Sequence, residues 1–247
     1  MIHIRDNWEI KKISRSCQIV KETLETLETY IKPGISTIEL DSIAEEFIRS
    51  KDAIPGFKGL YGFPATICAS LNDEVVHGVP SNRILKNGEI LSLDVGSIYD
   101  GYYGDHARTF AVGEISSKNK QLMDVTEESL YKGIEAAIPG NYIGDIGYAI
   151  QTHVESHGYG IVRDLVGHGI GEKLHEDPQI PNFGEKKTGP KIDVGMCFAI
   201  EPMVTIKSYE IFTKEDNWTI STVDGSYSAH FEHTITITKN GPKILTK

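Results

Sequence analysis

The 247-residue sequence has few cysteines, a deficit of basic side chains and no long apolar run. Its three cysteines, Cys17, Cys68 and Cys197, are odd in number and widely spaced, which argues against a disulfide framework and favours a reducing compartment. With 25 basic against 35 acidic residues, the chain lacks the positive charge that nonspecific nucleic-acid binding requires. No segment approaches the roughly 20 apolar residues of a membrane span, and the first dozen residues lack the apolar core of a signal peptide. We therefore expect a soluble cytoplasmic protein with a catalytic or small-ligand function.

Apolar side chains recur every three or four residues in four segments, which predicts four amphipathic helices. The segments are residues 8–30, 36–51, 120–137 and 145–157. A proline-glycine pair separates the first two segments at Pro33, and another separates the last two at Pro139, 106 positions later. The same plan is therefore used twice along the chain.

A strand pattern repeats with nearly the same spacing. Residues 87–94 and residues 194–201 each contain a turn glycine followed by an apolar strand that ends in a carboxylate, at Asp94 and Glu201. These two acids are 107 positions apart, in agreement with the spacing of the helices. Two independent matches at almost one spacing indicate an internal repeat.

The repeat predicts two similar α+β halves, at about residues 10–112 and 120–240, packed around a pseudo-twofold axis. Each half is expected to contribute one acid at the seam. In the first half, strands are expected over residues 90–98 and 102–112. No linker composition separates the halves, so residues 1–247 are expected to form a single domain with one core.

An Asp-Gly pair at residues 100–101, between two strand-like runs, is typical of a two-residue hairpin turn. Counting back from this turn places Gly96 opposite Asp105, so Asp94 lies on the same face, one diagonal away. The Cα atoms of diagonal neighbours are roughly 7 to 8 Å apart, a span that two carboxylates can close around a cation. Gly96 and Gly104 are expected to leave open space around the pair.

A pair of carboxylates on one sheet face is unfavourable unless positive charge lies between them, and no nearby lysine or arginine supplies it. Three further candidate ligands are His168, which lies between glycines, Glu201 and Glu232. With Asp94 and Asp105 they provide four negative charges and one neutral imidazole, which balance two divalent cations. Taken singly, each acid is more often a turn or capping residue. Their occurrence at repeat-related positions favours a metal centre.

Other residues with reactive side chains are predicted to be structural. His153 and His157 lie four apart on a predicted helix, as in a zinc site, but the intervening residues do not match HExxH, which favours surface histidines. His106 is expected to point away from the face that carries the two aspartates. Cys68 and Cys197 lie in apolar strands and are interpreted as packing residues.

Six segments together resemble the type I methionine aminopeptidases of the M24 metallopeptidase family, and the resemblance covers nearly the whole chain. The segments are NDEVVHGVP (72–80), SLDVG (92–96), GDHARTF (104–110), GHGIGEKLHEDPQIPNF (167–183), AIEPM (199–203) and FEHT (231–234). The resemblance implies the pita-bread fold, an α+β architecture of two pseudo-symmetric halves around a curved antiparallel sheet. It also implies a dinuclear metal centre whose ligands map onto the five residues already proposed, Asp94, Asp105, His168, Glu201 and Glu232.

The family removes the N-terminal methionine from nascent polypeptides when the second residue is small, and the resemblance implies that activity here. It implies that His77 contacts the substrate amide, that His175 holds the carbonyl oxygen, and that Glu201 acts as general base toward a water activated by the metals. An apolar pocket is expected for the methionine side chain. Its expected lining is Phe57, Leu60, Phe63, Cys68, Leu174 and Trp218, together with the two histidines.

The resemblance leaves the metal open among manganese, iron, cobalt and zinc. It favours a cytoplasmic monomer that acts on nascent chains, without a nucleic-acid or membrane partner, and it leaves contact with the ribosome open. The sequence departs from the family at His230, where relatives usually have glutamine, and at Leu60 and Leu174, where an aromatic residue is frequent. These departures leave the detailed shape of the pocket open.

Two rival functions deserve comparison. Proline-specific peptidases of the same fold share the ligands but usually carry an additional N-terminal domain, for which 247 residues leave no room. A non-catalytic paralogue that keeps the fold for binding would lose ligands, whereas this chain retains all five and both histidines.

The long helical insertion of type II enzymes has no space in the short intervals between His168, Glu201 and Glu232.

Overall fold

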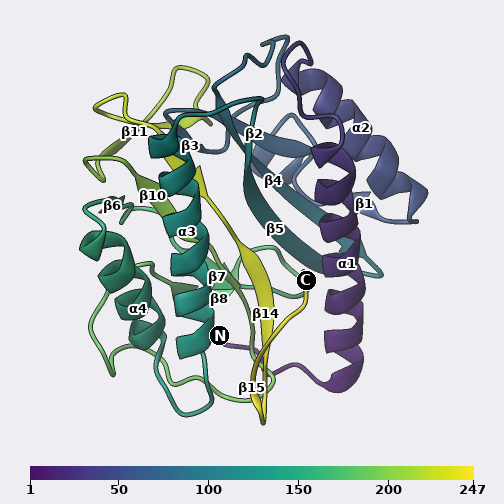
Figure 1. The fold of residues 1–247 in the computed structure, drawn as a ribbon. Coiled ribbons are helices and arrows are strands. Elements are labelled where there is room, and N and C mark those ends of the chain that lie inside the picture. Colours follow the sequence, from purple (N-terminus) through teal and green to yellow (C-terminus); the bar gives the residue numbers. More distant parts are fainter.

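The computed structural model describes residues 1–247, and its four α-helices lie in two pairs (Figure 1). They are α1 (Asn7–Glu28), α2 (Thr37–Ser50), α3 (Ser117–Ala136) and α4 (Ile143–Ser156). All four are predicted from the apolar periodicity, with boundaries that differ by one to three residues. None of the helices has the length and apolar content that crossing a membrane would require.

Side-chain caps determine where three of the helices begin. The Asp6 carboxylate accepts a hydrogen bond from the backbone of Glu9, whose own carboxylate accepts from the Asp6 backbone, and Ser36 and Glu39 form the same capping box on α2. The Ser116 hydroxyl caps α3, which explains why that helix begins earlier than the apolar pattern alone indicates.

The strands form two larger and two smaller antiparallel sheets. The first large sheet contains β1 (Ile54–Pro55), β2 (Ile67–Leu71), β4 (Ile90–Tyr99) and β5 (Tyr102–Ala111). The second contains, in spatial order, β15 (Gly241–Ile244), β14 (His233–Thr238), β9 (Cys197–Ile200), β7 (Gly167–Gly169) and β8 (Glu176–Ile180). One small sheet joins β10 (Met203–Thr205) to β13 (Ser228–His230) and β6 (Gly160–Ile161). The other joins β12 (Ile220–Thr222) to β11 (Ile211–Thr213) and β3 (Glu74–Val76). A short 3-10 helix, η1 (Leu60–Gly62), precedes β2.

The β4-β5 hairpin has the register that its Asp-Gly turn predicts. Tyr99 lies opposite Tyr102, and Gly96 lies opposite Asp105. Asp94 lies opposite Ala107, two positions along from that pair, and therefore shares a face with Asp105. The sequence alone thus places both aspartates correctly on the hairpin.

The two helix pairs lie on either side of the strands (Figure 1). Helix α1 packs on β4 and β5, whereas α3 packs on α4, β9, β10 and β13. Between the halves lies an apolar cluster that contains Cys17, Phe57 and Cys68 from the first half and Ile170 and Cys197 from the second. All three cysteines are unpaired and buried, and for Cys68 and Cys197 this agrees with their prediction as packing residues. This cluster forms the floor on which the candidate site lies.

Candidate metal centre and apolar pocket

The β4-β5 hairpin presents Asp94 and Asp105 on one face. The expectation that Gly96 and Gly104 leave open space around the aspartates was wrong. A Cβ atom at Gly96 would collide with the ring of Phe57, and one at Gly104 would lie 2.5 Å from a backbone nitrogen of α1. The missing side chains therefore let an aromatic ring and a helix backbone pack directly on the hairpin, which brings Phe57 next to the aspartates.

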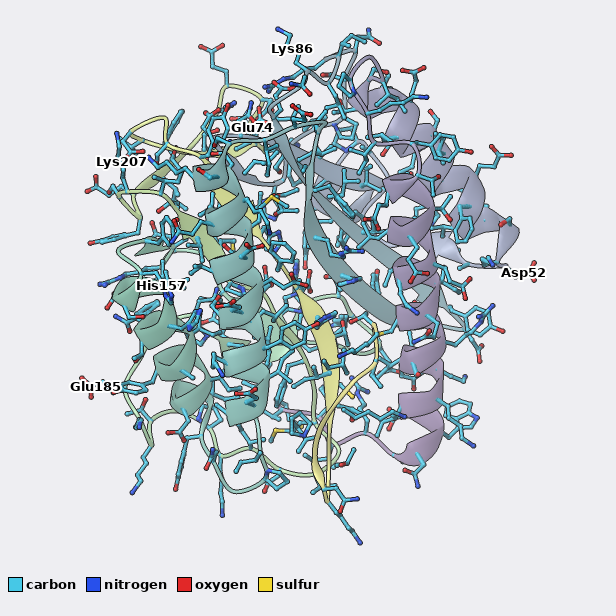
Figure 2. All side chains as sticks on the ribbon, in the orientation of Figure 1. Asp52, Glu74, Lys86, His157, Glu185 and Lys207 are labelled. Atoms are coloured by element: carbon cyan, nitrogen blue, oxygen red, sulfur yellow. The ribbon has the colours of Figure 1, made fainter.

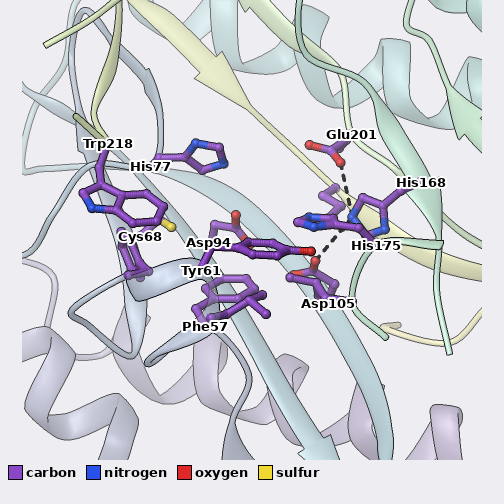
Figure 3. A pocket seen from close by; sticks show the side chains of 14 residues that line it. Phe57, Tyr61, Cys68, His77, Asp94, Asp105, His168, His175, Glu201 and Trp218 are labelled. Atoms are coloured by element: carbon purple, nitrogen blue, oxygen red, sulfur yellow. Dashed lines mark ion pairs between the residues drawn. The ribbon is translucent and has the colours of Figure 1, made fainter. Parts of the chain in front are cut away.

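The other three candidate ligands come from the second half. His168 lies in β7, Glu201 directly follows β9, and Glu232 lies between β13 and β14. The backbone nitrogen of Glu232 donates to the carbonyl oxygen of Ala107 at 2.9 Å, which fastens this segment to β5. All five side chains line one pocket (Figure 3). The structure thus brings together every residue that the sequence proposes for the metal centre.

The donor atoms of these residues are close to one another. Atoms of Asp105, His168 and Glu232 all lie within 4.8 Å of each other. His168 Nε2 is 3.7 Å from Asp105 Oδ2 and 3.6 Å from Glu201 Oε1. His168 Nδ1 donates to the carbonyl oxygen of Gly169 at 2.9 Å, because a carbonyl oxygen can only accept. The lone pair of Nε2 therefore faces the carboxylates, as in a metal-ligating histidine.

No protein cation neutralises the four carboxylates, because no lysine or arginine lines the pocket. One side-chain oxygen each of Asp94, Asp105 and Glu232 is buried without a hydrogen-bond partner. Burial raises the pKa of Asp94 to about 6 and that of Glu201 to about 8. Burial, followed by the neighbouring carboxylates, raises the pKa of Asp105 and Glu232 well above the ordinary range. Divalent cations would satisfy these oxygens and charges, so the residues present fit a metal centre.

The pocket that the carboxylates line is a cavity of about 120 Å³, and half of its lining residues are hydrophobic (Figure 3). Its lining includes every residue predicted for the pocket: Phe57, Leu60, Phe63, Cys68, His77, Leu174, His175 and Trp218. The rings of Phe63 and Trp218 meet edge to face with centroids 5.2 Å apart. Tyr61 also lines the cavity and was not predicted. It has a φ of 52° between two glycines in η1, and that glycine-rich aromatic loop was the only signal for it.

The two predicted catalytic histidines, His77 and His175, also line the cavity. His77 follows β3 and has a φ of 58°, and burial lowers its pKa to about 4, so its imidazole is neutral near pH 7. His175 lies at the exposed mouth of the cavity. Its ring meets that of His168 edge to face at 4.6 Å and stacks on Tyr61 at 6.0 Å between centroids.

His230 lies closer to the carboxylates than the sequence alone reveals. It is 2% exposed, and its Nε2 atom is 3.6 Å from Glu201 Oε2 without a hydrogen-bond partner. A protonated Nε2 would donate to this carboxylate after a small movement of either side chain. The departure at position 230 therefore faces Glu201 and not the solvent.

His106, His153 and His157 lie outside the site, as predicted. His106 points away from the aspartates, and its ring stacks on that of His233 with centroids 4.7 Å apart. His153 Nε2 lies 3.2 Å from a glutamate of α3, and His157 is exposed at the end of α4 (Figure 2). The rings of His153 and His157 are tilted at 48° to one another, with centroids 4.7 Å apart.

Comparison with known proteins gives a consistent result. The profile of metallopeptidase family M24 matches residues 11–239. The chain is 53% identical to a methionine aminopeptidase of Clostridium acetobutylicum, over all of this chain and 99% of that protein. It is 52% identical to methionine aminopeptidase 1 of Bacillus subtilis over the full length of both.

Solved structures agree in fold. The crystal structure of methionine aminopeptidase from Rickettsia prowazekii superposes with a TM-score of 0.99 at 43% identity, over all of both chains. A prolidase from Pyrococcus furiosus superposes with a TM-score of 0.81 at 25% identity, and this chain covers 65% of that longer protein. The pita-bread α+β fold expected from the sequence is therefore confirmed, and the full-length match is to the aminopeptidases.

Proposed function

The chain belongs to metallopeptidase family M24, and we propose that it is a methionine aminopeptidase, which hydrolyses the first peptide bond of a polypeptide that begins with methionine. One observation carries the proposal. Four carboxylates and one imidazole from both halves converge without a protein cation in one cavity of about 120 Å³, and most of the remaining lining of this cavity is apolar. Such a site can hold metals, and it can hold one apolar side chain next to them.

Five residues would hold two divalent cations: Asp94, Asp105, His168, Glu201 and Glu232. The number follows from charge, because four carboxylates balance two divalent ions. Bound there, such ions would lower the pKa of water and polarise the carbonyl of the scissile bond. The oxygen-rich donor set with one imidazole suits manganese, iron, cobalt or zinc, and the supply of each metal in the cell contributes to the choice.

The chain's own residues position the substrate and move the proton. The Glu201 carboxylate lines the cavity with its Oε1 atom 3.6 Å from His168 Nε2, and it takes the proton from the attacking water. His175, at the mouth, donates to the oxygen that gains negative charge, and His77, as a neutral imidazole, contacts the substrate amide.

The cavity determines what is cleaved. Phe57, Phe63 and Trp218 belong to its apolar lining, and a volume of about 120 Å³ suits one side chain and no longer segment. Its apolar wall with the Cys68 sulfur suits an unbranched thioether, which is the side chain of methionine. The second residue lies near His77 and His175 outside this cavity, where we expect crowding to favour a small side chain. We further propose that the protein acts as a cytoplasmic monomer on newly made polypeptides, with or without contact to the ribosome.

The test compares two peptides on one preparation. Protein treated with a chelator and then supplied with a single cation is assayed on Met-Ala-Ser and on an Xaa-Pro dipeptide, with the bound metal measured in parallel. We expect release of methionine from Met-Ala-Ser that depends on added cation, and little cleavage of the Xaa-Pro peptide. Cleavage of the Xaa-Pro peptide alone would instead assign the activity of the proline-specific relatives, and metal-independent cleavage would overturn the metal centre.

A further inference from the structure

His175 lies in the loop of residues 170–175, between β7 and β8. The backbone of this loop determines where the imidazole lies. The ring has aromatic contacts with Tyr61 and with His168 but no hydrogen bond to hold it. Tyr61 is itself 75% exposed, so it cannot fix a neighbouring ring firmly. Whatever holds this loop therefore decides where His175 points.

A buried arginine from the other end of the chain holds the loop. The Arg5 side chain is 4% exposed, and its Nη2 atom pairs with Oε2 of Glu176, the residue directly after His175. The second oxygen of Glu176 accepts from the backbone nitrogen of Lys173 at 3.0 Å, inside the loop. The Glu176 side chain is only 8% exposed, so this carboxylate ties loop and arginine together out of solvent.

Arg5 is in turn anchored to the body of the protein. Its Nη1 atom lies 2.9 Å from Oε1 of Glu9 in the first turn of α1, and its backbone nitrogen donates to the carbonyl oxygen of Gly195 at 2.8 Å. The guanidinium lies flat against Gly171, where a Cβ atom would collide with it. The carbonyl oxygen of Gly171 accepts from the backbone of Tyr103 in β5 at 2.8 Å. The arginine thus joins α1, the loop and the second half of the molecule.

We propose that Arg5 is a positioning residue, which holds the loop of residues 170–175 so that His175 faces the scissile carbonyl. This inference rests on the proposed function. A buried guanidinium is costly unless it is paired, and the planar fork here pairs with two carboxylates in fixed directions. Displacement of a catalytic group by about 1 Å can reduce turnover about 100-fold. Loss of the Arg5 fork would therefore reduce turnover while the metal ligands and the apolar cavity stay in place.

The test begins with steady-state kinetics on Met-Ala-Ser for Arg5→Met and Arg5→Lys. We expect Arg5→Met to lower kcat about 10- to 100-fold with KM changed less than about 3-fold, because the carbonyl contact and not the side-chain pocket is disturbed. Bound metal should equal that of the wild type. Arg5→Lys should recover part of kcat, since lysine keeps the charge but not the fork. Arg49→Met is the matched control, because it removes an Arg-Glu pair of the same sequence spacing whose arginine is exposed.

A double-mutant cycle separates positioning from general stability. With His175→Ala as background, Arg5→Met should change kcat less than about 2-fold, because the group it positions is gone. An undiminished further loss in that background would overturn the proposal, and so would a wild-type kcat in Arg5→Met with only a lower Tm. If Arg5→Met does not fold, the neutral pair Arg5→Met/Glu176→Gln takes its place in the same cycle. Failure of the wild type to cleave Met-Ala-Ser would reject the proposed function instead.

Discussion

At the scale of single residues, the site separates groups that hold charge from groups that orient the substrate. Asp94 belongs to the first kind: it lies on the hairpin face with one oxygen buried and unpaired. Replacing it by asparagine keeps the shape and removes the negative charge. We expect Asp94→Asn to lose bound metal and to reduce peptidase activity to background, while folding is retained because a neutral group costs less to bury.

Elemental analysis of the purified variant, together with its Tm, tests this expectation. Wild-type activity with undiminished metal would show that Asp94 does not take part in the centre. Loss of activity with a collapsed Tm would point to misfolding, which the isosteric substitution is chosen to avoid.

His175 belongs to the second kind. It has no hydrogen bond of its own and faces the cavity mouth. We predict that His175→Ala retains the metal content of the wild type and lowers kcat about 100- to 1,000-fold, the usual cost of one oxyanion donor. His157→Ala is the control, because that histidine is exposed at the far end of α4. Equal losses in the two variants, or loss of metal from His175→Ala, would contradict the assignment.

How far the sequence determines these residues depends on the kind of contact. Asp94 and Asp105 were predictable because hairpin register follows from a local turn. Tyr61 was not, because its left-handed backbone and its stacking on His175 arise only in the folded loop. Arg5 lay outside every motif, since its partner is 171 positions away. The roles of the five ligands and of the two catalytic histidines stay predictions until they are measured.

At the scale of secondary structure elements, the contact between α1 and β5 places the hairpin. Sequence reasoning treated Gly104 as a source of space, but the structure shows the helix backbone against it. We expect Gly104→Ala to lower the free energy of unfolding by about 1–3 kcal/mol or more, because a backbone contact cannot relax as a flexible side chain does. Chemical denaturation measures this loss.

The companion variant is Ser42→Ala, an exposed change on α2 that touches neither the hairpin nor the site. It should stay within about 0.5 kcal/mol of the wild type. If Gly104→Ala were equally mild, the packing of α1 on the hairpin would be looser than the structure shows. Element boundaries were predictable from apolar periodicity and caps, whereas this inter-element contact required the tertiary structure.

At the scale of the whole molecule, the two halves meet at a concentration of buried negative charge. The first half contributes Asp94 and Asp105, and the second contributes Glu201 and Glu232. Because neither half holds a compensating lysine or arginine in the pocket, the folded chain without metal retains protons that the unfolded chain releases. The division into two repeated halves stays a prediction. Because both halves contribute to this buried charge, it affects the free energy of unfolding of the whole chain.

The sign of the resulting pH dependence can be worked out between pH 6.5 and 8. Glu201 ionises near 4.5 when unfolded and at about 8 when folded, so its stabilising contribution is complete at low pH and is lost as pH rises toward 8. Buried His77 and His168, with folded pKa values of about 4 and about 3, act in the opposite direction, but mainly below their unfolded value of 6.5. Above pH 6.5 the carboxylates therefore dominate this site.

We predict that chelator-treated protein has a lower Tm at pH 8 than at pH 6.5, and that added manganese or cobalt raises Tm more at pH 8. A cation at about 100 times its Kd would add about 2.7 kcal/mol to the free energy of unfolding. Glu201→Gln, measured without metal, should flatten the fall in Tm because the titrating group is removed. A metal-free wild type that became more stable from pH 6.5 to pH 8 would show that burial does not raise the pKa of these carboxylates. The physical reason for a cation between the halves would then be lost.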